Sequence, residues 1–115
     1  MKSEVFFTSA KQSYIRAEET LPLKLDAIIN KLDIPRRVKN ETVAIKMHLG
    51  GNVGYSTIHP IFVRRVVEAV LDGGGKPFVT DVSNACTDAN KRGYTRETLG
   101  CPIYPNGGLD EKYFY

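Results

Sequence analysis

The stretch 42–81 constrains the fold more strongly than any other part of the chain. It begins with a short apolar run, 43–49, which has the length and composition of a buried strand. Residues 61–72 follow, with apolar side chains on one helical stripe and charged side chains opposite it. The glycine triplet 73–75 ends this helix, and residues 76–81 form a second strand-like run. Strand, helix and strand at this spacing predict a βαβ unit with parallel strands and a right-handed crossover.

The residues before this unit are expected to extend it. Residues 2–9 are rich in valine and phenylalanine and predict a first strand, and residues 21–32 carry apolar side chains at helical spacing. We therefore predict an α/β fold, a three-layer βαβαβ domain with a mainly parallel sheet on which helices 21–32 and 61–72 pack. The predicted strands lie near Val5, Ile45 and Val79, and the predicted core residues are Val43, Ile45, Val63, Val66, Val67, Val70, Phe78 and Val79.

Beyond this unit the periodicity weakens, and shorter elements are expected. Residues 94–99 predict a short helix closed by a glycine, residues 101–104 a short strand, and residues 106–108 a turn. The chain ends on three aromatic residues, 113–115, whereas C-termini are more often polar. This end indicates an N-terminal piece of a longer protein, with a contact surface at 113–115; the alternative is a short edge strand. We predict a single α/β domain over 1–115 that is part of a larger protein.

Composition excludes several functional classes. The chain has 115 residues, enough for one domain with a core, and its 42% hydrophobic and 25% charged content is ordinary for a globular protein. Its net charge of +3 is too small, and its basic residues are too dispersed, to predict nucleic-acid binding. No apolar run approaches the roughly 20 residues of a membrane span, and no signal peptide opens the chain. Two cysteines without a secretion signal predict reduced thiols in a cytoplasmic protein.

Two ionisable residues in the first strand of the βαβ unit carry the most chemical information. Lys46 and His48 occupy alternate positions and therefore share one face, near the carboxyl end of that strand. Ligands of open α/β sheets bind outside the carboxyl ends of the strands, and Asp81 ends the next strand. An ammonium, an imidazole and a carboxylate there predict a catalytic site that binds a phosphate or carboxylate and moves a proton. The alternative is a structural Lys46–Asp81 ion pair, with His48 capping a loop.

The loop 50–57 is the second candidate for a binding site. Glycines let a backbone approach a ligand, and hydroxyl groups just before a helix N-terminus favour anions. The predicted ligand-binding residues are Gly51, Asn52, Ser56 and Thr57. The loop matches neither the P-loop nor the dinucleotide pattern, and helix capping by Ser56 or Thr57 is the alternative.

No metal site is predicted. The histidine, cysteine and aspartate residues that could supply ligands match no zinc spacing; they are His48, His59, Asp81, Cys86, Asp88 and Cys101. His59 stands immediately before Pro60 and is more simply a residue of the helix start. Cys86 lies where a nucleophile would be accessible, although a small buried thiol is the commoner outcome.

Several sequence blocks resemble the family called "domain of unknown function 362". They are VAIKMHLG at 43–50, GNVGYSTIHPIFVRRVVEAV at 51–70 and GGGKPFVTDV at 73–82, and GCPIYPNGGLD at 100–110 resembles the point where that family continues into its remaining domain. Members are usually longer, so the resemblance implies a fragment or a shortened member. It also implies a context, because many longer members carry a ferredoxin-like segment with [4Fe-4S] clusters. Here Cys86 and Cys101 stand alone, so no cofactor is predicted within this chain.

Two classes of function fit these features. The first is an enzyme or redox-associated domain that binds a small anionic ligand at the strand ends. The second is a non-catalytic scaffold or assembly module, in which Lys46, His48 and Asp81 only join the sheet to its loops. In either class we expect uncovered apolar surface, and therefore a homo-oligomer or contact with a missing C-terminal domain.

Overall fold

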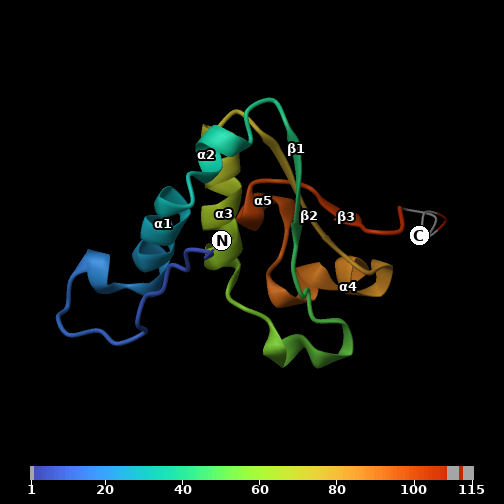
Figure 1. Cartoon of the computed structure of the whole chain (residues 1–115). Coiled ribbons are helices and arrows are strands. Elements are labelled where there is room, and N and C mark those ends of the chain that lie inside the picture. Colours follow the sequence, from blue (N-terminus) through green and yellow to red (C-terminus); the bar gives the residue numbers. More distant parts are fainter. Residues whose placement is uncertain (1, 109–111, 113–115) are drawn as a thin grey trace.

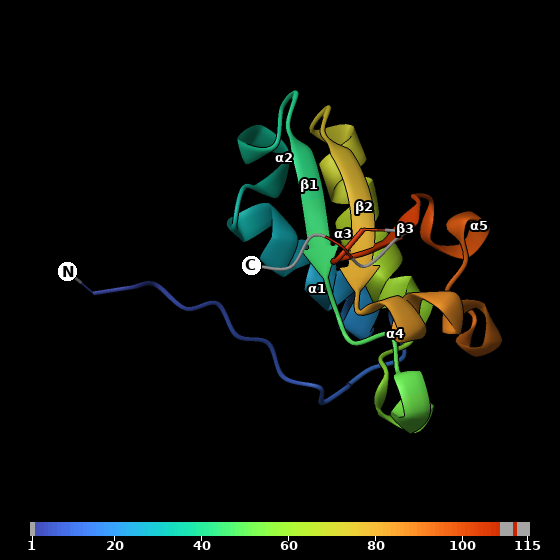
Figure 2. The same cartoon turned by 90° about the vertical axis from the view of Figure 1, so that its right-hand side faces the viewer.

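A three-stranded parallel sheet organises the chain, in the order β1 (Thr42–Lys46), β2 (Lys76–Asp81) and β3 (Ile103–Pro105). The computed structural model describes residues 2–108 and 112, and only the backbone of 52–53, so the predicted contact end at 113–115 lies outside the described residues. Figures 1 and 2 show the sheet with its helices. The prediction of an α/β fold with a parallel sheet is confirmed.

The crossover between β1 and β2 is helix α3 (Pro60–Asp72), as the periodicity predicts. Pro60 lies in its first turn, where the missing N–H costs nothing. Its apolar stripe is buried against the sheet through Val63, Val67 and Val70. The helix ends at the glycine triplet, where Gly74 has a φ of 79°, a conformation that glycine adopts without strain.

The other helices are short, apart from α1. They are α1 (Leu21–Lys31), α2 (Ile34–Arg37), α4 (Ser83–Thr87) and α5 (Arg96–Leu99), with 3-10 turns η1 (Ala17–Glu19), η2 (Gly51–Ser56) and η3 (Ala89–Arg92). α1 and α5 pack against α3, and α4 lies at the carboxyl end of the strands (Figure 1). The short helix predicted at 94–99 is α5, which begins with a Thr95–Thr98 capping box and is closed by Gly100.

Helices α1 and α3 cover one face of the sheet (Figure 2). α1 and α3 lie behind the sheet in Figure 2, on the face of Val43 and Ile45. On the other face Ala44, Lys46 and Tyr104 are exposed, whereas Phe78 is half-buried and Thr80 is buried. β1 alternates exposed and half-buried residues, which is the pattern of a strand with one solvated face.

The first predicted strand does not form. Residues 2–9 run as an extended arm without regular secondary structure, and the predicted βαβαβ order is supplied instead by β1, α3, β2, α5 and β3. Extended sequence becomes a strand only when its backbone finds an edge to pair with. Within the described residues, the arm has no such partner, since no backbone–backbone hydrogen bond involves residues 2–9.

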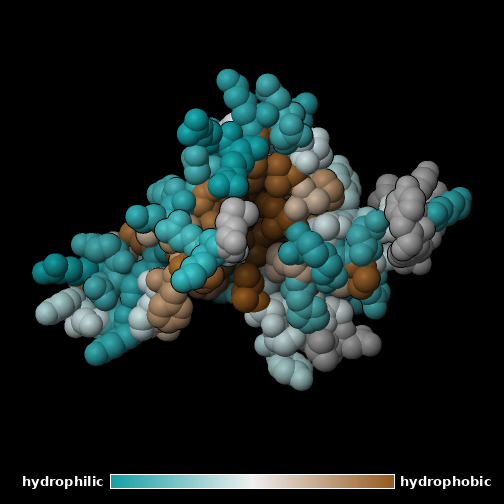
Figure 3. Space-filling model, in the orientation of Figure 1, coloured by the Kyte–Doolittle hydropathy of each residue, from teal (hydrophilic) through white to brown (hydrophobic). Residues whose placement is uncertain are grey.

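The core lies between α3 and the sheet and includes residues from the C-terminal segments. Its buried members are Leu49, Val63, Val67, Val79, Ala85, Ala89, Tyr94, Leu99 and Cys101, with Ile45, Met47, Cys86 and Ile103 packed against them. Of the other predicted core residues, Val70 is buried, whereas Val43, Val66 and Phe78 are only half-buried. Figure 3 shows apolar surface exposed in a hollow between β1 and the helical layer.

Candidate ligand site at the carboxyl edge of the sheet

Asp81 is the buried centre of the carboxyl edge of the sheet. It ends β2 and is 6% exposed. Its Oδ1 accepts hydrogen bonds from Lys46 Nζ at 3.0 Å and Val82 N at 2.9 Å, and its Oδ2 accepts one from Leu49 N at 2.8 Å. Burial alone would raise the pKa of Asp81, but the hydrogen bonds from Leu49, Lys46 and Val82 together hold that pKa below its usual value. Asp81 is therefore an ionised group that joins the ends of β1 and β2.

Lys46 is held at one end of its side chain and open to solvent along the rest. Its Nζ donates to Asp81 and to the carbonyl oxygen of Met47, at 3.0 Å in each case. The side chain is nevertheless 59% exposed. A lysine ammonium has three donors, so a fixed position with two donors used leaves one for a ligand.

Lys46 heads a row of polar side chains that crosses the open face of the sheet. The strand register places it beside Thr80, and Thr80 beside Tyr104, on the same face. Thr80 is 6% exposed, and within the described part of the chain its hydroxyl is buried without a hydrogen-bond partner. A buried hydroxyl without a partner next to an exposed ammonium is a polar site that a ligand could complete.

His48 lies two residues beyond Lys46 and is exposed. Its Nε2 lies 2.9 Å from the hydroxyl oxygen of Ser56 in η2, and either atom can be the donor, depending on the ring tautomer. The structure thus places the three predicted catalytic residues at one edge, in two pairs: Lys46 with Asp81, and His48 with Ser56. The pairing of Lys46 with Asp81 also fits the structural alternative.

The loop predicted to bind a ligand is closed by its own hydrogen bonds. The hydroxyl of Thr57 donates to the carbonyl oxygen of Gly54 at 2.9 Å, so Thr57 stabilises the loop. Gly51 has open space where a side chain would stand, with a φ of 46°, and the side chain of Asn52 lies outside the described residues. Neither Ser56 nor Thr57 caps α3, because that position belongs to His59, whose Nδ1 accepts from Ile61 N at 3.2 Å.

Arg92 is a residue of this region that the sequence reasoning missed. Its Nε donates to the carbonyl oxygen of Leu49 at 2.6 Å, across 43 positions of the chain. The side chain fills the space beside two glycines, since a Cβ at Gly50 would meet it at 2.4 Å and one at Gly54 at 2.6 Å. These glycines therefore accommodate Arg92, and no local sequence signal links them to a distant arginine. The Nη2 of Arg92 is buried without a partner in the described residues.

Neither cysteine belongs to a group of described residues that could hold a metal ion. Both are free; Cys101 is buried, and Cys86 is half-buried, with its Sγ 3.4 Å from the carbonyl oxygen of Asp81. Burial raises the pKa of each thiol, so neither is a thiolate at neutral pH. A [4Fe-4S] cluster requires four cysteine ligands, which this chain does not supply. Among residues 2–108 and 112, no group of three or more histidine, cysteine or acidic side chains could hold a metal ion.

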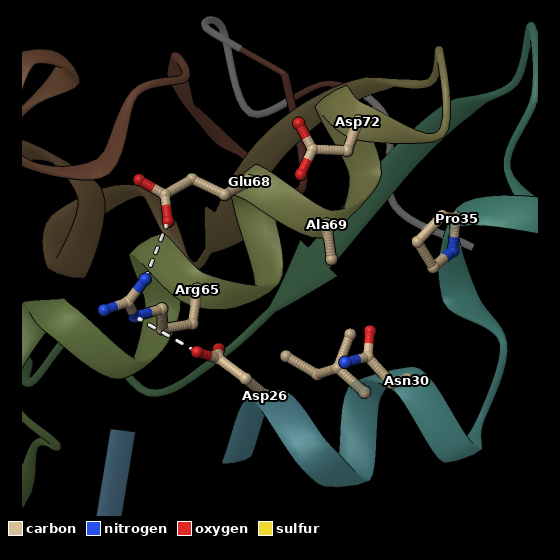
Figure 4. A pocket seen from close by; sticks show the side chains of 8 residues that line it. Asp26, Asn30, Pro35, Arg65, Glu68, Ala69 and Asp72 are labelled. Atoms are coloured by element: carbon tan, nitrogen blue, oxygen red, sulfur yellow. Dashed lines mark ion pairs between the residues drawn. The ribbon is translucent and has the colours of Figure 1, made fainter. Parts of the chain in front are cut away.

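A polar cavity lies on the other side of the molecule, between α1 and α3 (Figure 4). Its volume is about 250 Å³. The guanidinium of Arg65 lies in ion-pair range of Asp26 at 3.8 Å and of Glu68 at 3.5 Å. Because Arg65, the cation among the described lining residues, already has two acidic partners, this cavity does not favour an anion. The described residues also include no helix with the length and apolar character needed to cross a membrane.

Comparison with known proteins identifies a family. The family model described as "Domain of unknown function (DUF362)" matches residues 43–115, which is more than half of the chain. The matched range includes the two strands of the βαβ unit, the candidate site at the carboxyl edge of the sheet and the loop 50–57. No curated protein and no solved structure matches the chain.

Proposed function

We propose that this chain, which belongs to the family described as Domain of unknown function (DUF362), binds a small anionic ligand at the carboxyl edge of its sheet. The observation that carries the proposal is the position of Lys46. Its ammonium is fixed by Asp81 and Met47, yet the side chain is 59% exposed at the edge where α/β sheets bind their ligands. An oriented cation of this kind suits a phosphate or a carboxylate.

In this proposal each residue has a separate role. Lys46 binds the anion, and Asp81 is a positioning residue that holds Lys46 in place. His48, paired with Ser56, is the group that would transfer a proton if the ligand is also a substrate. Gly51, Asn52 and Thr57 form the rim of the site.

The cellular context forms part of the same proposal. We infer a cytoplasmic location from the two free cysteines, and an association with iron–sulfur proteins from the family resemblance. A cluster needs four cysteine ligands and this chain has two, so any cluster belongs to another segment or another protein. Iron analysis of the complete gene product, purified without oxygen, tests this part.

A second candidate function is a scaffold without a ligand. It is favoured by the coordination of Asp81, whose two carboxylate oxygens already accept three hydrogen bonds from this chain. In a scaffold, Lys46 and Asp81 only connect the ends of β1 and β2.

Ligand titration separates the two candidates. We expect inorganic phosphate or a short dicarboxylate to raise the melting temperature, and Lys46→Met to weaken its binding by about tenfold in calorimetry, the loss of one charged hydrogen bond. Lys76→Met is the matched control, because Lys76 is exposed on the same face at the opposite end of β2. Equal effects of the two substitutions, or no stabilisation by any of the anions, would support the scaffold.

A further inference from the structure

The N-terminal arm, residues 2–8, has two distinct faces. Phe6 and Thr8 are half-buried and line a cavity with Leu23 and Ala27 of α1. Val5 and Phe7 also border this cavity but are 83% and 86% exposed. Alternation with a period of two is the pattern of a strand with one face already covered. The arm therefore presents a second apolar face that its own helix leaves uncovered.

The base of the arm is tied to α1. The Nζ of Lys24 donates to the carbonyl oxygens of Ser9 at 3.0 Å and Lys11 at 2.6 Å. Residues 5–8 line a cavity with α1, and the arm projects from the body of the protein on the side of β1 (Figure 2). The arm therefore does not pair with the sheet edge of its own chain. A second molecule that approaches from the side of β1 would meet the arm.

β1 offers a free edge on the same side. It pairs with β2 alone among the described strands. Met47 N donates to Thr80 O, and Glu41 O accepts from Lys76 N. The backbone N–H and C=O groups of the odd-numbered residues in this strand therefore face β2. The N–H and C=O groups of Thr42, Ala44 and Lys46 consequently face outward, and such unpaired groups are a template for another strand.

The apolar hollow beside this edge completes the surface (Figure 3). Val43, Ile45 and Met47 of the β1 segment are half-buried, as are Phe62 and Val66 of α3. A strand added to β1 would place every second side chain over this hollow.

We propose that residues 4–8 of a second copy of this chain add to the free edge of β1, with Val5 and Phe7 in the apolar hollow. The five arm residues match the five residues of β1 in length. Because each copy carries both an arm and an edge, mutual exchange about a twofold axis gives a closed dimer. This interaction is a β-strand addition and does not depend on the ligand site.

The first test is the mass of the protein in solution, measured by light scattering and sedimentation over a range of concentrations. We expect a dimer, twice the chain mass of 12.8 kDa. Deletion of residues 2–8 and the single substitution Phe7→Asp should each weaken dimerisation at least tenfold. Ile15→Asp is the control, because Ile15 is fully exposed but lies outside the arm. A monomer at all concentrations, or a dimer that both arm variants leave unchanged, would overturn the proposal.

The second test uses the edge. Ala44→Pro removes an outward N–H and leaves the hydrogen bonds to β2 in place, and proline is tolerated on edge strands. We expect this variant to keep its circular dichroism spectrum and to become monomeric. Mixing it with the arm-deleted protein should restore a heterodimer, since one supplies an arm and the other an edge. Dimers of Ala44→Pro alone, or no heterodimer in the mixture, would contradict strand addition.

Discussion

Replacing Asp81 should cost much more stability than replacing Lys46, although the two side chains form one ion pair. The structure gives the reason. The carboxylate is 6% exposed and accepts from two backbone N–H groups, whereas the lysine side chain is 59% exposed. Hydrogen bonds to a charged group contribute roughly 1.5–3 kcal/mol each, and an ion pair with an exposed partner contributes about 0–1 kcal/mol.

These values predict the outcome of substitution. Asp81→Ala leaves Leu49 N without its acceptor in a fully buried residue and Val82 N in a half-exposed one. We therefore expect a loss of about 2–4 kcal/mol in the free energy of unfolding. Lys46→Met leaves both backbone hydrogen bonds intact and should cost at most about 1 kcal/mol.

Urea denaturation followed by circular dichroism measures both losses. Lys76→Met again serves as the charge-matched control, because Lys76 forms no ion pair with any other described residue and lies at the other end of the sheet face. If Lys46→Met costs as much as Asp81→Ala, the ion pair holds the edge together and the account based on backbone donors is wrong. A loss below about 1 kcal/mol for Asp81→Ala would reject the structural role of Asp81.

Three further predictions follow from the same region. The lowered pKa of Asp81 means that its contribution is complete well above the ordinary value of 3.8 and is lost as the pH falls through the folded-state value. The gap in unfolding free energy between wild type and Asp81→Asn should therefore narrow from pH 7 to pH 3; a constant gap would contradict this. Gly54→Ala should cost about 1–3 kcal/mol by crowding Arg92, and the cost should largely vanish in an Arg92→Ala background in a double-mutant cycle. With a thiol reagent at neutral pH, half-buried Cys86 should react faster than buried Cys101, and both slower than free cysteine, because burial raises both pKa values.

Elements with a strong local signal were predictable from the sequence. Helix α3 combines a periodic apolar stripe, a proline in its first turn and a glycine stop, and these act within a few residues of each other. The arm failed as a strand because a strand exists only with a partner edge, which local composition does not specify. The exposed face of β1 was visible in the sequence, because Thr42, Ala44 and Lys46 alternate with the apolar Val43 and Ile45. The apolar run was nevertheless interpreted as a strand buried on both faces.

The candidate site was predictable only in part, for a related reason. Lys46, His48 and Asp81 stand at strand ends, and the rule for parallel sheets brings such positions to one edge. Arg92 and the buried core residues Tyr94 and Leu99 come from segments with weak periodicity. Their positions depend on long-range packing, so no short window of sequence predicts them.

The peptide groups of Leu49 link the sheet edge to the loop. Its N–H donates to the Asp81 carboxylate and its carbonyl oxygen accepts from the Arg92 guanidinium, so side chains of opposite charge hold the two sides of one buried residue. His48 precedes this fixed point directly, and Gly50 follows it against Arg92. The orientation of the imidazole toward Ser56 therefore depends on Asp81 and Arg92, neither of which needs to touch a ligand. Substitution of either residue would disturb the position of His48 through the backbone. A loss of ligand binding in those variants would therefore reflect a displaced His48, and not the loss of a direct contact between Asp81 or Arg92 and the ligand.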